Sequence, residues 1–228
     1  MGPAGGTLCS TAGDLGRFAG LFLDEEGGLL SAASVKAMQT PQVEVPPTGM
    51  ADFWGLGPHG KTWDGKLVCG HSGTNTGGSS YLLWVPELGA AVATVVNTPG
   101  LGYPFAMEIF RSVFPDSFGI TVPPGPVHDE SVALDPANLV GTYEMVGVRL
   151  DITAEGDRLL ARLGEASPID GKIKTADPSP LLPVSPTRFV PTDPAIDGSR
   201  GWALAFINAE TGPATHLLNG VFAMRRMP

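Results

Sequence analysis

The feature that most constrains the fold of this 228-residue chain is the stretch of residues 67–98, LVCGHSGTNTGGSSYLLWVPELGAAVATVVNT. Its apolar runs predict three strands, at residues 67–71, 79–85 and 90–97, and the last two are separated by a Pro-Glu-Leu-Gly turn. Residues 90–96 are all uncharged, so we expect both faces of that strand to be covered, with a strand on each side. The segment between the first two strands is polar and glycine-rich. A buried sheet with a polar, glycine-rich end is therefore expected.

Composition narrows the class of protein. The 31 glycines and 22 prolines favour many turns and strands over a helical bundle. A net charge of -9 argues against a nucleic-acid or anionic-membrane partner, because such partners need a basic surface. No apolar run approaches the roughly 18 residues of a membrane span. No signal peptide is visible at residues 1–6. If the gene starts further upstream, a targeting segment would lie outside this chain. The sequence is therefore compatible with a location in the bacterial cytoplasm and with export.

The two cysteines give no sign of a metal site. Neither Cys9 nor Cys69 has a second cysteine or a histidine at ligand spacing, and two cysteines do not make a disulfide framework. We interpret both as small apolar residues of the interior. The sequence therefore predicts neither a metal nor another cofactor.

Two patterns in the chain resemble motifs of one enzyme family. His71-Ser72-Gly73, followed by the glycine-rich residues 77–81, resembles the third active-site motif of class C β-lactamase-like serine hydrolases, a group that includes penicillin-binding DD-peptidases and related esterases. Residues 3–18, PAGGTLCSTAGDLGRF, are similar to a second stretch of that family. Two patterns in the family's order are more specific than either pattern alone. The resemblance implies a partial β-lactamase-like fold, an antiparallel sheet with flanking helices.

The resemblance also implies the site residues His71, Ser72, Gly73 and Thr74. His71 would bind a substrate group or assist proton transfer, with a charge that depends on pH and so suits esterase or peptidase chemistry better than strict β-lactam binding. Ser72 could hydrogen-bond substrate or His71. Gly73 would let the strand come close, and the Thr74 N–H would point at a developing oxyanion. From the residues alone, His71 could instead simply hydrogen-bond a loop carbonyl.

The family's other two motifs are not found in this chain. No Ser-x-x-Lys is present, and neither is Tyr-x-Asn or Ser-x-Asn. The chain thus looks like the C-terminal half of a serine hydrolase, whose N-terminal half would be supplied in cis or in trans. Alternatively, it is a catalytically inactive fragment that serves as a binding or assembly module. The missing half also predicts exposed apolar surface, and hence a homodimer or poor solubility of the isolated chain.

Local signals predict several further elements. Ser10 or Thr11 should cap a helix that reaches Phe22, and Ser31 should start a second, short one. Residues 53–57 resemble a short strand of the family, and His59 in the following connection is expected on the solvated surface. Residues 103–114 predict an amphipathic helix on the sheet.

The chain changes character near residue 115. We expect an α+β organisation with the partial hydrolase domain at residues 1–114, a Pro-rich linker at 115–136 and a second domain at 137–228. About eight short strands in the last part predict a small antiparallel barrel, because closure removes exposed edges. Its Val-Gly-Thr-Tyr-Glu start, residues 140–144, is similar to the lipocalin-like domain appended to many members of the hydrolase family.

Overall fold

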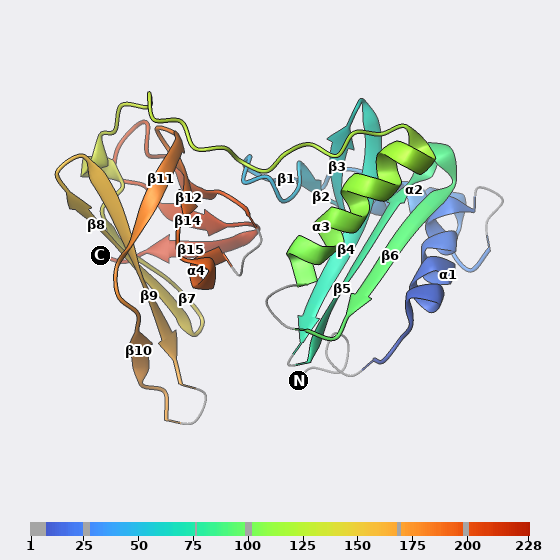
Figure 1. Ribbon diagram of the computed structural model, residues 1–228, viewed down its shortest axis with the longest axis horizontal. Coiled ribbons are helices and arrows are strands. Elements are labelled where there is room, and N and C mark those ends of the chain that lie inside the picture. Colours follow the sequence, from blue (N-terminus) through green and yellow to red (C-terminus); the bar gives the residue numbers. More distant parts are fainter. Residues whose placement is uncertain (1–7, 25–27, 76, 99–101, 168–169, 198–200) are drawn as a thin grey trace. The chain divides into compact units, whose positions relative to one another are not determined.

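The computed structural model describes residues 8–24, 28–75, 77–98, 102–167, 170–197 and 201–228. The chain forms two compact units, Met1–Val45 with Ala51–Pro123, and Pro46–Met50 with Pro124–Pro228. The first unit contains a six-stranded antiparallel sheet with helices, and the second contains an antiparallel barrel (Figure 1). The predicted α+β fold class is confirmed. Residues 115–123 of the predicted linker belong to the first unit and residues 124–136 to the second.

The strands of the first sheet lie in sequence order, and each pairs antiparallel with the next. They are β1 (Val43–Glu44), β2 (Phe53–Trp54), β3 (His59–Trp63), β4 (Lys66–Asn75), β5 (Gly78–Val85) and β6 (Ala90–Val96). The predicted turn before β6 is the 3-10 turn η1 (Pro86–Leu88), closed by Gly89 at φ 60°, a left-handed conformation that suits glycine.

One strand is longer than predicted. The polar, glycine-rich segment after His71 is not a crossing between strands, because β4 continues to Asn75. Residues 71–75 pair with residues 78–82 of β5, so backbone pairing extends the strand where the side-chain pattern suggests a loop.

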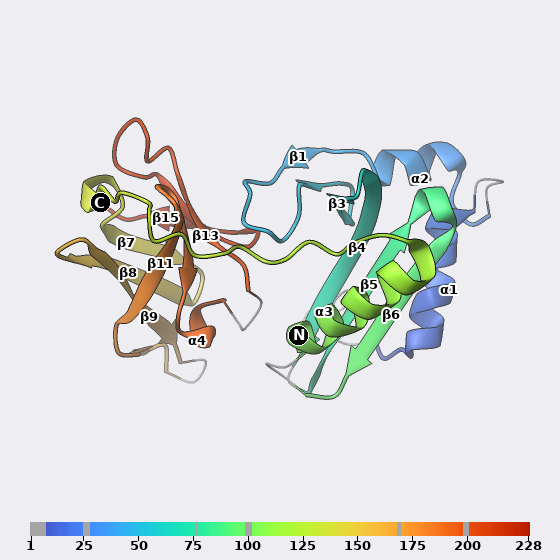
Figure 2. The same cartoon turned by 45° about the horizontal axis from the view of Figure 1, so that its top comes forward.

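Helices cover the two faces of the sheet (Figures 1 and 2). On one face, α1 (Ala12–Leu23) and α2 (Ala32–Met38) pack through Phe22 and Val35 against Cys69, Leu82 and Trp84. On the other face, α3 (Gly102–Val113) continues into the π-helical turn η2 (Phe114–Phe118) and packs through Phe110 against Val68, Tyr81 and Leu83. Alternate residues of β4 and β5 therefore enter two separate cores.

The predicted helix starts are confirmed. The Thr11 side chain accepts a hydrogen bond from the Asp14 N–H, and the Ser31 side chain accepts one from the Ser34 N–H. Each cap satisfies a backbone donor that the first helical turn leaves free.

The apolar strand β6 differs from the expectation. It pairs with β5 on one side and is the last strand of the sheet among the described residues. The Val95 side chain is 51% exposed. The expected neighbour on the second side and the full cover of both faces are therefore absent from the described part of the chain.

The second unit is a closed eight-stranded barrel with one added strand. Pairing of β9 with β8 closes the ring, and β10 adds to β9 outside it. Its elements are η3 (Pro136–Asn138), β7 (Gly141–Met145), β8 (Val148–Glu155), β9 (Arg158–Ala166), β10 (Ile173–Thr175), β11 (Ser179–Ser185), β12 (Arg188–Pro191), α4 (Pro194–Asp197), β13 (Leu204–Ile207), β14 (His216–Asn219) and β15 (Phe222–Arg226). The core includes Tyr143, whose hydroxyl donates to the Leu139 carbonyl at 2.8 Å.

The segment Pro46–Met50 belongs to this second unit although it lies between β1 and β2 in sequence. Thr48 is fully buried, and its carbonyl accepts a hydrogen bond of 2.8 Å from the Ala203 N–H. The Pro47 carbonyl accepts one of 3.2 Å from Arg188 Nη1. A distant piece of sequence thus completes the barrel unit.

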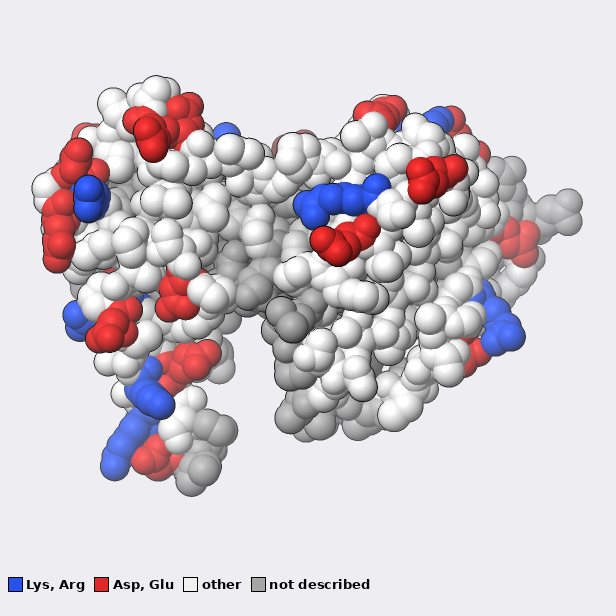
Figure 3. Space-filling view, in the orientation of Figure 1, with Lys and Arg blue, Asp and Glu red and all other residues white. Residues whose placement is uncertain are grey.

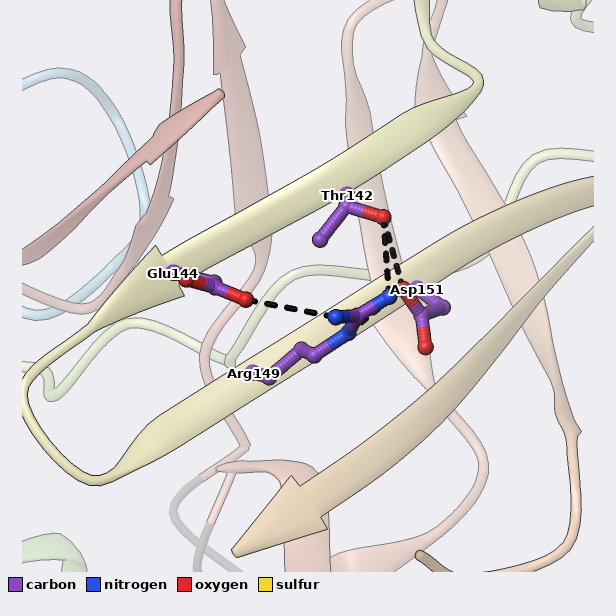
Figure 4. Close-up of polar contacts among 4 residues, drawn as sticks. All are labelled: Thr142, Glu144, Arg149 and Asp151. Atoms are coloured by element: carbon purple, nitrogen blue, oxygen red, sulfur yellow. Dashed lines mark hydrogen bonds and ion pairs between the residues drawn. The ribbon is translucent and has the colours of Figure 1, made fainter. Parts of the chain in front are cut away.

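A polar network lies across β7 and β8 (Figure 4). Asp151 Oδ1 accepts hydrogen bonds from Thr142 Oγ1 at 2.7 Å and from Arg149 Nε at 2.9 Å, and Arg149 Nη1 lies 3.4 Å from Glu144 Oε1. Burial tends to raise the pKa of Asp151, but the hydrogen bonds from Arg149 and Thr142 and the charge of Arg149 hold that pKa below its ordinary value. All three charged side chains are partly exposed, so the network contributes modestly to stability.

On the face shown in Figure 3, acidic and basic side chains occur in small groups separated by uncharged surface. No helix in the described part of the chain has the length and apolarity needed to cross a membrane.

The prediction that His59 lies on the surface is wrong. His59 is the first residue of β3 and is 4% exposed, because β3 is an inner strand between β2 and β4. Burial lowers the pKa of His59 to about 3, and the charges of Lys61 and His71 add smaller effects in the same direction. The folded protein therefore keeps this imidazole neutral.

We predict that His59 makes the protein less stable in acid. The unfolded chain binds a proton at His59 near pH 6.5 and the folded chain only near pH 3, so stability is fully present above pH 6.5 and falls below it. The expected loss at pH 4 is about 3 kcal/mol. Urea unfolding between pH 4 and pH 8 should show a weaker acid dependence in His59→Phe, which keeps an aromatic ring. Parallel pH profiles for the two proteins would contradict the prediction.

Candidate functional site

The four predicted site residues lie in the second half of β4. His71, Ser72, Gly73 and Thr74 pair with Leu82, Tyr81, Ser80 and Ser79 of β5. On the other side, β3 pairs only with residues 66–70 of β4. Among the described residues, β4 from residue 71 onward therefore has a partner strand on one side and an open edge on the other.

The alternation of an antiparallel ladder decides which backbone groups face this open edge. Lys66 and Trp63 close the tight hairpin between β3 and β4, so the even-numbered residues of β4 direct their N–H and C=O groups toward β3. The Gly60 carbonyl supports this alternation, because it points away from β4 and accepts from the Asp52 N–H at 2.9 Å. Continuing the pattern, Ser72 and Thr74 direct their N–H and C=O groups to the side where β3 has ended.

His71 is exposed, and its ring is held by two contacts. Its Nδ1 lies 2.7 Å from the Ser72 carbonyl oxygen. A carbonyl only accepts hydrogen bonds, so Nδ1 carries the hydrogen and the neutral ring offers a lone pair at Nε2. The ring also meets Trp54 edge to face, with centroids 5.7 Å apart and an interplanar angle of 83°. His71 thus binds a carbonyl, as the simpler interpretation expects, but it remains at the surface.

A groove of about 820 Å³ lies beside this end of β4, between the sheet and α1. Gly73 and Thr74 line it, whereas His71 and Ser72 are not among its lining residues. Its other walls include Leu15 and Phe18 of α1, Ser80 of β5 and Val95 of β6. The structure therefore brings Gly73 and Thr74 to the groove, whereas His71 and Ser72 lie just before them on the same strand, outside its lining.

The glycines of β4 and β5 are needed for different reasons. A Cβ at Gly70 would lie 2.4 Å from the Leu82 carbonyl oxygen, and one at Gly78 would lie 2.5 Å from the Val96 carbonyl oxygen. At Gly73 the nearest atom to such a Cβ, Ser80 Oγ, is 3.6 Å away, which is an ordinary contact. Packing within the described chain therefore explains Gly70 and Gly78 but does not require glycine at position 73.

Sequence reasoning missed Trp54 and His59 as neighbours of His71. Trp54 and His59 are register partners on β2 and β3, with ring centroids 5.5 Å apart. The aromatic pair Phe53-Trp54 is the signal in the sequence that marks β2, but only the register shows which ring meets His71. On the far side of β4, Thr74 Oγ1 lies 3.3 Å from Ser79 Oγ.

The described residues contain no group of three or more His, Cys, Asp or Glu side chains that could hold a metal ion. The polar groups of the candidate site are the His71 imidazole, the hydroxyls of Thr74 and Ser79, and the backbone of β4 along its open edge.

Comparison with solved structures shows the fold that this chain shares. A crystal structure of SurE with D-Leu superposes with a TM-score of 0.69 at 24% identity, covering 96% of this chain and 50% of that one. A second structure of SurE gives 0.71 at 23% identity, with 96% and 48% covered. The octameric penicillin-binding protein homologue from Pyrococcus abyssi gives 0.39 at 16% identity, with 88% and 44% covered. This chain spans about half the length of the SurE chains.

A comparison with curated protein sequences gives no match. The family described as Beta-lactamase matches residues 1–110, which include α1, the whole first sheet and most of α3. Both patterns noted in the sequence fall within these residues. Over residues 1–110 the chain is therefore β-lactamase-like.

Proposed function

We propose that this chain supplies the third-motif strand of a serine hydrolase site, which cleaves an amide, ester or lactam through an acyl-enzyme. The observation that carries the proposal is the open edge of β4 after Gly70, where the Thr74 backbone faces outward near the exposed imidazole of His71. An outward N–H on a rigid strand is the kind of donor that stabilises an oxyanion.

In this proposal each residue has a separate task. The Thr74 N–H donates to the oxygen that becomes negative when the nucleophile attacks the carbonyl carbon. The second donor would be the N–H of the nucleophilic serine, which this chain does not contain. His71 holds its hydrogen at Nδ1 against the Ser72 carbonyl, so Nε2 is free to accept a proton or to hydrogen-bond the substrate. Ser72 positions His71 through that carbonyl.

The groove indicates what kind of substrate would fit. Its walls combine the apolar side chains Leu15, Phe18 and Val95 with the backbone of β4. An acyl group with an apolar side chain could lie there while its backbone pairs with the open edge. One of the similar structures is that of SurE with D-Leu. We therefore propose a peptide-like substrate and include a D-leucine ester among the probes.

The nucleophile would come from an N-terminal half, supplied in cis or in trans. Two features of the first unit leave room for such a part: the described residues place no strand beside the outer edge of β6, and the groove is bounded by exposed residues such as Phe18. The family's Ser-x-x-Lys and Tyr-x-Asn motifs would lie on that part.

The test uses the purified chain with nitrocefin, p-nitrophenyl acetate, a D-leucine p-nitrophenyl ester and a fluorophosphonate probe. We expect no turnover and no labelling of the chain alone, because it lacks the Ser-x-x-Lys serine. Turnover should appear when the polypeptide encoded immediately upstream is added or fused. There His71→Gln should lower kcat by roughly 10²–10⁴-fold, whereas His216→Gln in the barrel should not. Labelling of the chain alone would overturn the assignment of the nucleophile. No turnover in either case would favour the inactive binding or assembly module.

A second prediction compares Gly73→Ala with Gly70→Ala. The alanine at position 70 would clash with the Leu82 carbonyl and should cost roughly 1–3 kcal/mol of unfolding free energy, while the one at position 73 should change it by less than about 0.5 kcal/mol. In the complemented enzyme, Gly73→Ala should nevertheless lower kcat/KM about tenfold, because its methyl group projects into the groove. Equal destabilisation by the two substitutions would place the reason for Gly73 in the fold instead.

A third prediction concerns the free edge of β6. An apolar edge strand pairs readily with another chain, so the isolated chain should self-associate as its concentration rises in sedimentation experiments. Val95→Lys should reduce this association. The same substitution at Val146, which is fully exposed at the β7–β8 turn, serves as the matched control and should leave it unchanged. A compact monomer at every concentration would contradict the prediction.

A further inference from the structure

Trp54 lies between two histidine rings. Its ring centroid is 5.7 Å from that of His71, at an interplanar angle of 83°, and 5.5 Å from that of His59, at 55°. His71 is exposed, whereas His59 is 4% exposed. The tryptophan therefore connects a surface imidazole with a buried one.

The backbone around Trp54 is firmly held. Its carbonyl accepts a hydrogen bond of 2.9 Å from the Gln42 N–H, and the next residue, Gly55, donates to the Pro58 carbonyl at 2.8 Å. A Cβ at Gly55 would lie only 2.0 Å from the Met38 carbonyl oxygen, so the chain passes very close to the end of α2 at this point. These contacts fix the backbone from which the Trp54 ring projects toward His71.

We propose that Trp54, supported from behind by His59, is a positioning residue that holds His71 in the tautomer with hydrogen on Nδ1. Trp54 restricts rotation of the imidazole, and the Ser72 carbonyl then selects the nitrogen that carries the hydrogen. The result is a lone pair at Nε2 in a fixed direction. What that lone pair does in catalysis rests on the proposed function; the tautomer itself is a property of this chain alone.

The charges near this group suit such a role. Burial keeps His59 neutral, as its pKa of about 3 indicates, so His59 adds no positive charge behind Trp54 in neutral solution. Two charged groups act on His59: Lys61 on the same strand, whose charge Asp52 partly balances, and His71 itself. A buried neutral ring can support Trp54 by packing alone. Among the described residues the buried His59 Nδ1 has no hydrogen-bond partner, so no hydrogen bond at that atom competes with the packing of its ring on Trp54.

The test is ¹⁵N NMR of the histidine rings in the full chain at pH 9, where ordinary imidazoles are neutral. Of the four histidines, His71 is assigned by the loss of its signals in His71→Gln. In the wild type, its Nδ1 should give a protonated-type resonance and its Nε2 an unprotonated-type one. Trp54→Leu should shift both resonances toward the average of two exchanging tautomers. Trp54→Phe, which keeps a ring, should largely restore the wild-type pattern.

His59 is tested in the same way. His59→Ala should move the His71 resonances part of the way toward the average, while His59→Phe should leave them unchanged. An unchanged His71 pattern in a folded Trp54→Leu protein would overturn the proposal. So would a wild-type His71 that already shows averaged resonances. Circular dichroism and the amide spectrum establish that each variant is folded.

Activity provides a separate readout. In the complemented enzyme, Trp54→Leu should lower kcat about tenfold with little change in KM, because the imidazole is present but less often in the productive form. If the complemented enzyme shows no turnover at all, the proposed function fails, whereas the NMR result still decides the role of Trp54. If turnover is present and unaffected by Trp54→Leu, the positioning role in catalysis is rejected.

Discussion

The first unit depends on the unequal pairing of β4. Over residues 66–70 this strand has neighbours on both sides, and over residues 71–75 its only neighbour within the described part of the chain is β5. The paired half is buried between two cores, with Val68 facing α3 and Cys69 facing α1 and α2. The buried half anchors the strand, and the open half presents backbone N–H and C=O groups along its uncovered edge. A strand bonded along its full length on both sides would have no free groups to offer a ligand.

Several elements followed directly from local sequence signals. The caps at Thr11 and Ser31, the turn at residues 86–89 and the amphipathic α3 each depend on a few neighbouring residues, and each is present as predicted. The barrel was also predicted from the density of short strands. Such features are decided by side-chain chemistry and periodicity within one turn or one strand.

The structure differs from the predictions where pairing between strands decides the extent of a strand or the burial of a side chain. The glycine-rich half of β4 has little intrinsic preference for a strand, but β5 extends it to Asn75. His59 looked like a turn residue, yet the register with Trp54 and Gly70 buries it in an inner strand. The aromatic contact of Trp54 with His71 is likewise set by register, which no local pattern encodes. At the candidate site, sequence therefore indicated the strand and its motif, while only the fold indicated which groups face outward and what supports them.

The segment Pro46–Met50 has a consequence for how this chain can be divided or recombined. Its residues are encoded between β1 and β2 of the first unit, but Thr48 is buried in the second, where its carbonyl bonds to Ala203. The polypeptide thus passes from one unit to the other at three places in its sequence. A genetic exchange with a single breakpoint near Pro123 would transplant the barrel without this peptide and leave the Ala203 amide without its acceptor. An exchange that keeps the second unit intact must therefore carry the segment Pro46–Met50 together with the barrel.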